Sequence, residues 1–328
     1  MEKKETIPTL DIKDLHISFK TDDGIVRAVN GLNLTIGRGK TLGLVGETGA
    51  GKTTTGLSVL KLIQTPPGKV EAAHILLDGK DIMTATEKEM EKIRGKEVSM
   101  IFQDPMTSLN PVITVEDQIA EVIEHHEKLG REGSLKKARQ MLELVGIPAE
   151  RGHEYPHQFS GGMKQRVVIA IALACSPRLL IADEPTTALD VTIQAQVLEM
   201  MRELKGKYEM SMLMITHDLG IVAEICDEVA IIYAGRIVEK GNLEDIFENT
   251  AHPYTKGLFA SLPNLEDPTA KLKPIRGLMP DPANLPEGCP FAPRCDYCTE
   301  KCTQILPEYK ALSDSHTVAC HLFDKEEV

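Results

Sequence analysis

The architecture of this chain is indicated first by residues 46–54, Gly46-Glu47-Thr48-Gly49-Ala50-Gly51-Lys52-Thr53-Thr54, which directly follow the apolar run 41–45. A strand followed by GxxxxGK[ST] is typical of a phosphate-binding loop. Three glycines let the backbone bend until several N–H groups point at one anion, and Lys52 adds a positive charge for the β- and γ-phosphates. The hydroxyl of Thr53 suits a magnesium ion. Taken alone, these residues could also form a glycine-rich turn followed by a chance Lys-Thr.

A second motif that suits phosphate chemistry ends another apolar run, Leu179-Leu180-Ile181-Ala182-Asp183-Glu184. Such a continuous run is typical of a buried parallel strand. Asp183 is expected to emerge beside the phosphate loop and to hold magnesium, while Glu184 is expected to polarise the attacking water as general base. A solvated strand end is the alternative for this motif alone. Its combination with residues 46–54 favours nucleotide chemistry.

A third motif, Phe159-Ser160-Gly161-Gly162, precedes an apolar helix that is expected to end near Cys175. Ser160 fits the N-cap position, and the two glycines leave the first N–H groups of the helix open to an anion. An ordinary capped helix start is the alternative interpretation.

The pattern of apolar residues predicts an α/β fold. Residues 9–36 alternate with period two around the turn Asp22-Asp23-Gly24, which indicates an antiparallel β-layer. Helical stripes between about 104 and 165 predict a helical insert, with Gly146 closing one helix. Apolar strands resume at 179–183, 212–216 and 229–233.

Composition limits the class of protein. The chain has 328 residues, enough for one large or two smaller domains, and 37 basic against 49 acidic residues give a net charge of −12. This balance argues against nucleic acid as the main partner. No apolar segment follows the N-terminal residues as in a signal peptide, and the longest apolar run, residues 167–175, is too short to span a bilayer. The sequence therefore predicts a soluble intracellular protein.

The seven cysteines are distributed unevenly. Cys175 and Cys226 stand in apolar surroundings, which predicts buried core thiols. The other five are Cys289, Cys295, Cys298, Cys302 and Cys320, in a proline-rich region with little apolar periodicity. A segment with so small an apolar core needs a metal or covalent cross-link to be stable. The candidates are a [4Fe–4S] cluster, a zinc ion with four thiolate ligands, or disulfides. The pair Cys295-x-x-Cys298 by itself resembles a metal-binding pair, which complicates the ligand assignment.

With these motifs in order, the chain resembles the ATP-binding subunit of an ABC transporter over about residues 8–245. The resemblance implies an α/β P-loop NTPase core with an antiparallel β-layer and a helical subdomain inserted at about 104–165. It also implies that residues 1–250 form the ATPase domain and that 251–328 form a C-terminal Pro/Cys-rich extension. ATP and Mg²⁺ are the implied ligands.

The resemblance assigns a role to each matching residue. Glu184 is the general base, His217 contacts the γ-phosphate, Gln103 touches the metal and the water, and Phe19 stacks on adenine. Magnesium is held by Thr53, Gln103 and Asp183. The implied ATP-binding loop comprises Gly46, Glu47, Thr48, Gly49, Ala50, Gly51, Lys52, Thr53 and Thr54.

Two further motifs resemble the parts of the family that act across a dimer. Ser160-Gly161-Gly162 matches the signature motif, which binds the γ-phosphate of the nucleotide held by the opposite subunit. Asp190, in Thr187-Ala188-Leu189-Asp190, resembles the D-loop that crosses the dimer interface. The chain departs from the family at Met163, where most members carry Gln; the main phosphate contacts are expected to survive this change.

Three segments are similar to the dipeptide and oligopeptide importer branch: residues 102–111, residues 157–163 and the cysteine-containing tail from Gly288 to His321. The four cysteines of that branch's extension are associated with a [4Fe–4S] cluster. The resemblance therefore implies a cluster on Cys289, Cys295, Cys302 and Cys320, with zinc as the alternative.

The implied partners are two membrane-spanning permease subunits, a second ATPase subunit that is either a paralogue or another copy, and indirectly a solute-binding protein. The implied location is the cytoplasmic face of the membrane, with import of dipeptides or oligopeptides as the function. Nickel or glutathione import is an alternative cargo. A non-transport ABC ATPase is the alternative class, although such proteins usually carry a coiled coil or tandem ATPase units, which this sequence lacks.

Overall fold

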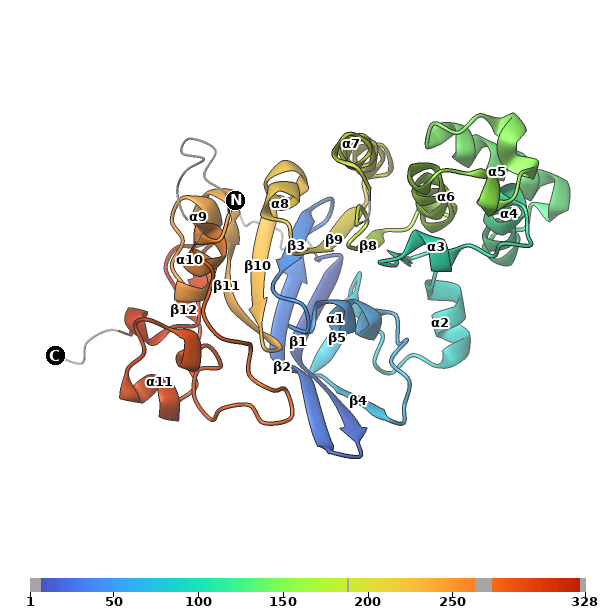
Figure 1. The fold of residues 1–328 in the computed structure, drawn as a ribbon. Coiled ribbons are helices and arrows are strands. Elements are labelled where there is room, and N and C mark those ends of the chain that lie inside the picture. The colour runs from blue at the N-terminus through green and yellow to red at the C-terminus, as the bar shows by residue number, and fades with distance from the viewer. Residues whose placement is uncertain (1–6, 188, 263–272, 325–328) are drawn as a thin grey trace, which may run out of the picture.

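The computed structural model describes residues 7–187, 189–262 and 273–324 of the chain (Figure 1). Two β-sheets lie between a group of helices at one end and the C-terminal region at the other. The first sheet is the antiparallel β-layer that the alternation over 9–36 predicts. In the described residues its order is β2-β1-β5-β6, with β4 also paired to β1. Its strands are β1 (Leu10–Thr21), β2 (Gly24–Ile36), β4 (Gly68–Glu71), β5 (His74–Leu77) and β6 (Lys80–Asp81).

The second sheet has eight strands among the described residues, in the order β12-β13-β11-β10-β3-β9-β8-β7. A parallel group carries the predicted motifs: β10 (Glu228–Tyr233), β3 (Thr41–Val45), β9 (Ser211–Thr216), β8 (Leu179–Asp183) and β7 (Val98–Ile101). An antiparallel edge continues it through β11 (Arg236–Asn242), β13 (Thr317–Val318) and β12 (Lys310–Ala311). All five residues of β3 and of β8 are buried, as expected for central strands.

The α-helices of the described residues fall into two groups along the chain. Those of the N-terminal half are α1 (Lys52–Val59), α2 (Glu87–Ile93), α3 (Pro105–Ser108), α4 (Val115–His126), α5 (Gly130–Leu144) and α6 (Gly161–Leu173). The remainder are α7 (Val191–Tyr208), α8 (Leu219–Ile225), α9 (Leu243–Phe247), α10 (Pro253–Ala260) and α11 (Glu300–Gln304). Short 3₁₀ turns occupy Ala149–His153, Pro156–Gln158, Ala292–Arg294 and His321–Phe323.

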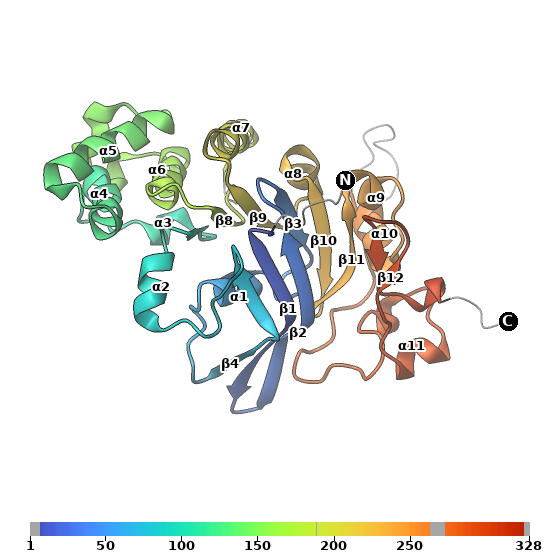
Figure 2. The same cartoon turned by 180° about the vertical axis from the view of Figure 1, so that it is seen from behind.

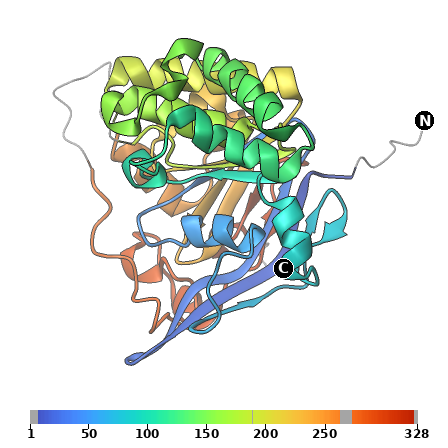
Figure 3. The same cartoon turned by 90° about the vertical axis from the view of Figure 1, so that its right-hand side faces the viewer.

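The predicted helical insert is present as α3 to α6, gathered on one side of the molecule above the β-layer (Figure 3). Ile119 and Ile123 of α4 and Leu142 of α5 are fully buried, so the apolar stripes of these helices face one another. Gly146 follows α5 with a φ of 76°, the left-handed conformation that closes a helix.

The C-terminal region packs more closely onto the core than its sequence suggests. Val318 of β13 pairs with Glu239 of β11, which adds the end of the chain to the main sheet (Figure 2). Phe291 and Tyr254 are almost fully buried in the main core. The strands concerned are two residues long and the apolar anchors are isolated, so no periodic pattern reveals them. The predicted boundary near residue 250 falls between α9 and α10.

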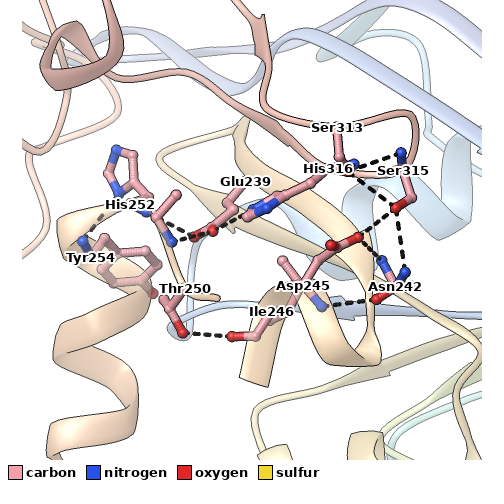
Figure 4. A network of polar contacts seen from close by, with 11 residues as sticks. Glu239, Asn242, Asp245, Ile246, Thr250, His252, Tyr254, Ser313, Ser315 and His316 are labelled. Atoms are coloured by element: carbon pink, nitrogen blue, oxygen red, sulfur yellow. Dashed lines mark hydrogen bonds and ion pairs between the residues drawn. The ribbon is translucent and has the colours of Figure 1, made fainter. Parts of the chain in front are cut away.

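One buried carboxylate joins this region to the sheet (Figure 4). Glu239 of β11 is fully buried and accepts hydrogen bonds from the backbone N–H groups of Ala251 (2.6 Å) and His252 (3.0 Å). Its third partner is Nε2 of His316, at 2.9 Å. A buried carboxylate is tolerated only when its oxygens are paired in this way. Glu239 therefore ties the start of α10 and the loop before β13 to the same point on the sheet.

Replacing Glu239 by Gln should destabilise the fold. The Gln side chain keeps the volume but offers one acceptor oxygen to three donors, and its NH₂ group would face a donor. We expect the free energy of unfolding to fall by about 3 kcal/mol, measured by urea denaturation followed by circular dichroism. The exposed Glu248→Gln is the matched control. Equal denaturation midpoints for the two variants would contradict a structural role for the Glu239 carboxylate.

Candidate functional site

Residues 46–54 connect β3 to the start of α1 and leave no room for larger side chains at two of their glycines. A Cβ atom at Gly46 would lie 2.2 Å from the carbonyl oxygen of Ile232, and one at Gly51 would lie 2.4 Å from that of Ala28. Gly51 also has a φ of 99°, which favours glycine. The loop therefore packs directly against the backbones of β10 and β2. Its glycines are needed for this close packing as well as for the turn.

Lys52 is buried at the base of the loop. Its Nζ donates to the carbonyl oxygens of Gly46 (2.7 Å) and Glu47 (3.0 Å). Burial lowers the pKa of Lys52, and the nearby carboxylates of Glu184, Asp183 and Glu47 act in the opposite direction. The ammonium group thus lies inside the curve of the loop, where an incoming phosphate would meet it.

Asp183 ends β8, one strand away from β3. Its side chain is 2% exposed and is hydrogen-bonded to the side chain of Thr53, the first residue after Lys52. Burial raises the pKa of Asp183, while the Thr53 hydroxyl lowers it. The structure therefore brings together the two residues that the sequence assigns to magnesium, a carboxylate and a hydroxyl, which are hard oxygen ligands.

Glu184 is the centre of the polar contacts at this edge of the sheet. Its carboxylate accepts hydrogen bonds from Nε2 of Gln103 (2.9 Å) and the hydroxyl of Thr187 (3.0 Å), and lies 2.9 Å from Nδ1 of His217. Its backbone has a φ of 47°, an uncommon left-handed conformation for a non-glycine residue. The backbone turn after β8 thus directs the side chain toward Gln103 and His217.

The charge state of Glu184 suits a base. Burial of the carboxyl raises the pKa of Glu184, but hydrogen bonds from His217 and Thr187 and the charges of His217 and Lys52 outweigh it, so the pKa lies below its ordinary value. The group is therefore an anion at neutral pH and is able to accept a proton.

These residues surround one cavity of about 400 Å³. The residues that line it are Ala28, Thr48, Gly49, Gly51, Lys52, Thr53, Thr54, Gln103, Glu184 and His217. Motifs that are far apart in the sequence thus meet around a space of the size that small-molecule ligands occupy.

Other predicted site residues lie elsewhere. Phe19 of β1 is half-buried, pairs with Val26 of β2 and Gly68 of β4, and is not among the residues lining the cavity. Its stacking role stays a prediction.

The signature and D-loop residues form a second polar surface. Ser160 caps α6 by accepting from the N–H of Met163, and Asp190 caps α7 by accepting from the N–H of Ile193. A Cβ at Gly162 would lie 2.6 Å from Ile193, so the two helix starts pack together. Ser160, Gly161 and Asp190 are exposed, and none of them lines the cavity.

Several residues that contact the site have no role that the sequence indicates. Thr187, which donates to Glu184, stands in the sequence only as part of the D-loop motif. Arg294 forms an ion pair with Glu47 of the phosphate loop, and the hydroxyl of Tyr254 accepts from the backbone N–H of Glu47. These two residues lie far along the chain, and no local pattern indicates the contacts.

Four of the five clustered cysteines, Cys289, Cys295, Cys302 and Cys320, line one small cavity. Cys298 is exposed and does not line it. Burial raises the pKa of Cys289 to about 11. Within the part of the chain that the structure describes, no group of three or more His, Cys, Asp or Glu side chains is arranged to hold a metal ion.

A buried histidine also lines this cavity. His252 is 1% exposed, and its Nδ1 accepts a hydrogen bond from the N–H of Tyr254 at 3.0 Å. Burial lowers the pKa of His252 to about 3, so the ring is neutral and its proton lies on Nε2. That Nε2–H has no hydrogen-bond partner. A buried donor without a hydrogen-bond partner is costly to the fold.

The two isolated cysteines lie where apolar surroundings predict them, with one difference. Cys226 is buried, and burial raises its pKa to about 12, whereas Cys175 is only half-buried. As for the bilayer, none of the helices in the described segments is both long and apolar enough to cross one.

Two known families match this chain. Residues 29–187 match the family described as ABC transporter, and residues 238–302 match the family described as oligopeptide/dipeptide transporter, C-terminal region. The first match spans the loop, the signature and the Asp183-Glu184 motif. The second includes Glu239, His252 and three of the cysteines that line the cavity.

Curated relatives are similar over nearly the whole chain. The oligopeptide transport ATP-binding protein OppD of Bacillus subtilis is 52% identical, covering 94% of this chain and 87% of its own. The dipeptide transport ATP-binding protein DppD of the same organism is 50% identical, covering 96% of this chain and 95% of its own.

Solved structures support the fold. The cbiO1 protein of Clostridium perfringens, part of the ABC transporter complex cbiONQ, has a TM-score of 0.64 at 28% identity over 74% of this chain and 91% of its own. The ATP-binding cassette MJ0796, a dimer with ADP and Pi, has the same TM-score of 0.64 at 24% identity, covering 71% of this chain and 98% of its own. On the strength of the curated relatives, the chain belongs to the ATP-binding proteins of the ABC transporter family, in its oligopeptide/dipeptide group.

Proposed function

We propose that this chain is the ATP-hydrolysing subunit that powers the import of oligopeptides or dipeptides through an ABC transporter. The observation that carries the proposal is the convergence of Lys52, Glu184, Gln103 and His217 on one cavity at the mouth of the phosphate loop, with Asp183 buried beside Thr53 of that loop. The names of the relatives favour peptides over nickel or glutathione as cargo. Their nearly full-length match disfavours a non-transport ATPase.

Binding of ATP replaces contacts that the loop makes with itself. Lys52 Nζ now donates to two carbonyl oxygens of the loop. On binding, it turns to the β- and γ-phosphates, which the backbone N–H groups of residues 46–54 surround. Thr53, Asp183 and Gln103 are the residues that would hold Mg²⁺, which when bound neutralises part of the phosphate charge. The Thr53–Asp183 hydrogen bond keeps two of these ligands side by side before nucleotide arrives.

Hydrolysis follows from the position of Glu184. Its carboxylate orients a water for attack on the γ-phosphorus and accepts the proton that this water loses, while the bond from the γ-phosphorus to the bridging oxygen breaks and ADP leaves. Gln103 and His217 each lie 2.9 Å from one of its oxygens, which fixes the carboxylate before the substrate binds. His217 is exposed at the mouth of the cavity, where a bound γ-phosphate would meet its ring while Nδ1 stays on Glu184.

A second ATPase subunit completes the site. Ser160 and Gly161 are exposed and lie outside the cavity, so the helix start that would bind a γ-phosphate faces a different nucleotide. Each ATP is then enclosed between one subunit's phosphate loop and the other subunit's signature. Asp190 lies at the interface, and closure of the pair moves helices α3–α6 together with two membrane-spanning permease subunits at the cytoplasmic face. A solute-binding protein delivers the peptide.

The four cysteines that line the small cavity are proposed to hold a [4Fe–4S] cluster. A single zinc ion needs four sulfurs at about 2.3 Å from one point, whereas a four-iron cluster takes one thiolate at each iron. The four cysteines line one cavity, and the segment that carries three of them matches the C-terminal region of oligopeptide/dipeptide transporters, which favours the cluster. When bound, it would cross-link the tail, since ATP hydrolysis requires no electron transfer.

Replacing Glu184 by Gln should lower the rate of phosphate release by at least about 100-fold, because the amide cannot accept the proton from water. Binding of ATP and ATP-dependent dimerisation should survive, since the phosphate loop is unchanged. Phosphate release and light scattering with and without ATP measure the two effects. Glu203→Gln on the exposed face of α7 is the control. If the Glu184→Gln variant releases phosphate at a rate within twofold of the parent's, Glu184 is not the general base.

A comparison of two single substitutions, Cys302→Ser and Cys298→Ser, tests which cysteines bind the cluster. After anaerobic expression, the parent and Cys298→Ser should contain iron and inorganic sulfide and show broad absorbance at about 400 nm. Cys302→Ser should lose most of both, because Cys302 lines the cavity and Cys298 does not. A colourless parent with one zinc per chain would establish the zinc alternative, and iron loss in Cys298→Ser would reassign the ligands.

A further inference from the structure

The phosphate loop contacts the C-terminal region through the carboxylate and the backbone N–H of one residue, Glu47. Its carboxylate oxygens lie 2.9 and 3.0 Å from Nη1 of Arg294, and its backbone N–H donates to the hydroxyl of Tyr254 at 3.1 Å. Its carbonyl oxygen accepts from Nζ of Lys52 at 3.0 Å. Glu47 thus links Arg294 and Tyr254 directly to the lysine that meets the phosphates.

Arg294 is held firmly in this position. Its side chain is only 6% exposed, and its Nε donates to the carbonyl oxygen of Arg276 at 2.9 Å. Nη1 also donates to the hydroxyl of Tyr233 at 3.2 Å, and the guanidinium lies over the rings of Tyr233 and Phe291. An ion pair held by so many fixed partners loses little side-chain entropy, in contrast to an exposed surface pair.

Tyr254 is equally constrained. It is fully buried, and its ring packs against those of Tyr233 and Phe291 at centroid distances of 4.6 and 5.4 Å. The backbone of its helix start is anchored through His252 to the buried carboxylate of Glu239. The tyrosine hydroxyl therefore reaches the loop from a rigid support and satisfies one backbone donor of Glu47.

The turn that carries Arg294 lies between two of the cavity-lining cysteines. Ala292 N–H donates to the carbonyl oxygen of Cys289, and Cys295 N–H donates to that of Ala292. The fold of the cysteine-containing segment thus brings Arg294 to the core, where Tyr233 of β10 and Glu47 hold its guanidinium.

We propose that Arg294 and Tyr254 are positioning residues for nucleotide binding, which hold Glu47 and with it the first turn of the phosphate loop in the conformation that receives ATP. The inference rests on the proposed ATPase function. Without these contacts, only the hydrogen bonds from Ala50 and Lys52 to the carbonyl oxygen of Glu47 hold this residue, and the N–H donors of the loop are less well aligned for the phosphates. Ground-state binding of ATP weakens, while the chemistry at Glu184 is affected less.

The test compares Arg294→Met, Tyr254→Phe and Glu47→Gln in the full chain. Each variant keeps most of the side-chain volume and removes one contact of the clamp formed by Arg294, Tyr254 and Glu47. We expect the KM for ATP to rise about 5- to 20-fold in Arg294→Met and Glu47→Gln, with kcat within about threefold of the parent. Tyr254→Phe, which leaves one N–H without its acceptor, should raise KM about threefold.

Two further variants distinguish a role in positioning the loop for ATP from a role in the stability of the fold alone. Arg276→Met removes an exposed cation from the same segment and should leave KM unchanged. The double variant Glu47→Gln with Arg294→Met should bind ATP no more weakly than either single variant, because both remove the same interaction. Unchanged KM in all three clamp variants, with a lower melting temperature, would overturn the inference while leaving the ATPase function intact. A parent chain that neither binds nor hydrolyses ATP would overturn the proposed function itself.

Discussion

The site depends on the parallel pairing of β3, β9 and β8. In this register Val45 lies beside Thr216, and Asp183 beside Ile215, so all three strands end at one edge of the sheet. The phosphate loop, the Asp183-Glu184 pair and His217 each follow one of these strands directly. A shift of one residue in either pairing would turn the side chains of that strand to the other face and separate the motifs. The complete burial of β3 and β8 makes such a shift costly.

The phosphate loop at this edge of the sheet also depends on contacts from the C-terminal region. Glu239 ties the start of α10 and the loop before β13 to strand β11, and Tyr254 and Arg294 reach from there to Glu47. The region that looks like an appendage in the sequence is therefore part of the support of the phosphate loop. Its short strands, isolated aromatic anchors and four cavity-lining thiols suit a segment whose stability comes from specific tethers more than from an apolar core of its own.

The groups around Glu184 keep its carboxylate ionised and oriented, as a general base requires. Burial alone raises the pKa of the Glu184 carboxyl, and the partners His217, Thr187 and Lys52 lower it below its ordinary value. His217, Thr187 and Gln103 contact its oxygens, so the carboxylate is oriented as well as ionised. Under the proposed function, Ser160 and Asp190 serve the partner's nucleotide, which explains why they are exposed and grouped at two adjoining helix starts instead of lining the cavity.

The sequence alone determined the α/β class, the β-layer, the helical insert and the residues around the cavity, from Lys52 to His217. These signals are local: a glycine spacing, an apolar strand followed by carboxylates, a period of two or of 3.6. Only the tertiary structure decided that Thr187 contacts Glu184, that Cys298 stands apart from the other clustered cysteines, and that Arg294 pairs with Glu47. Arg294 and Glu47 lie at opposite ends of the chain, and a charge has no preferred partner until packing brings one within reach and removes water from between them.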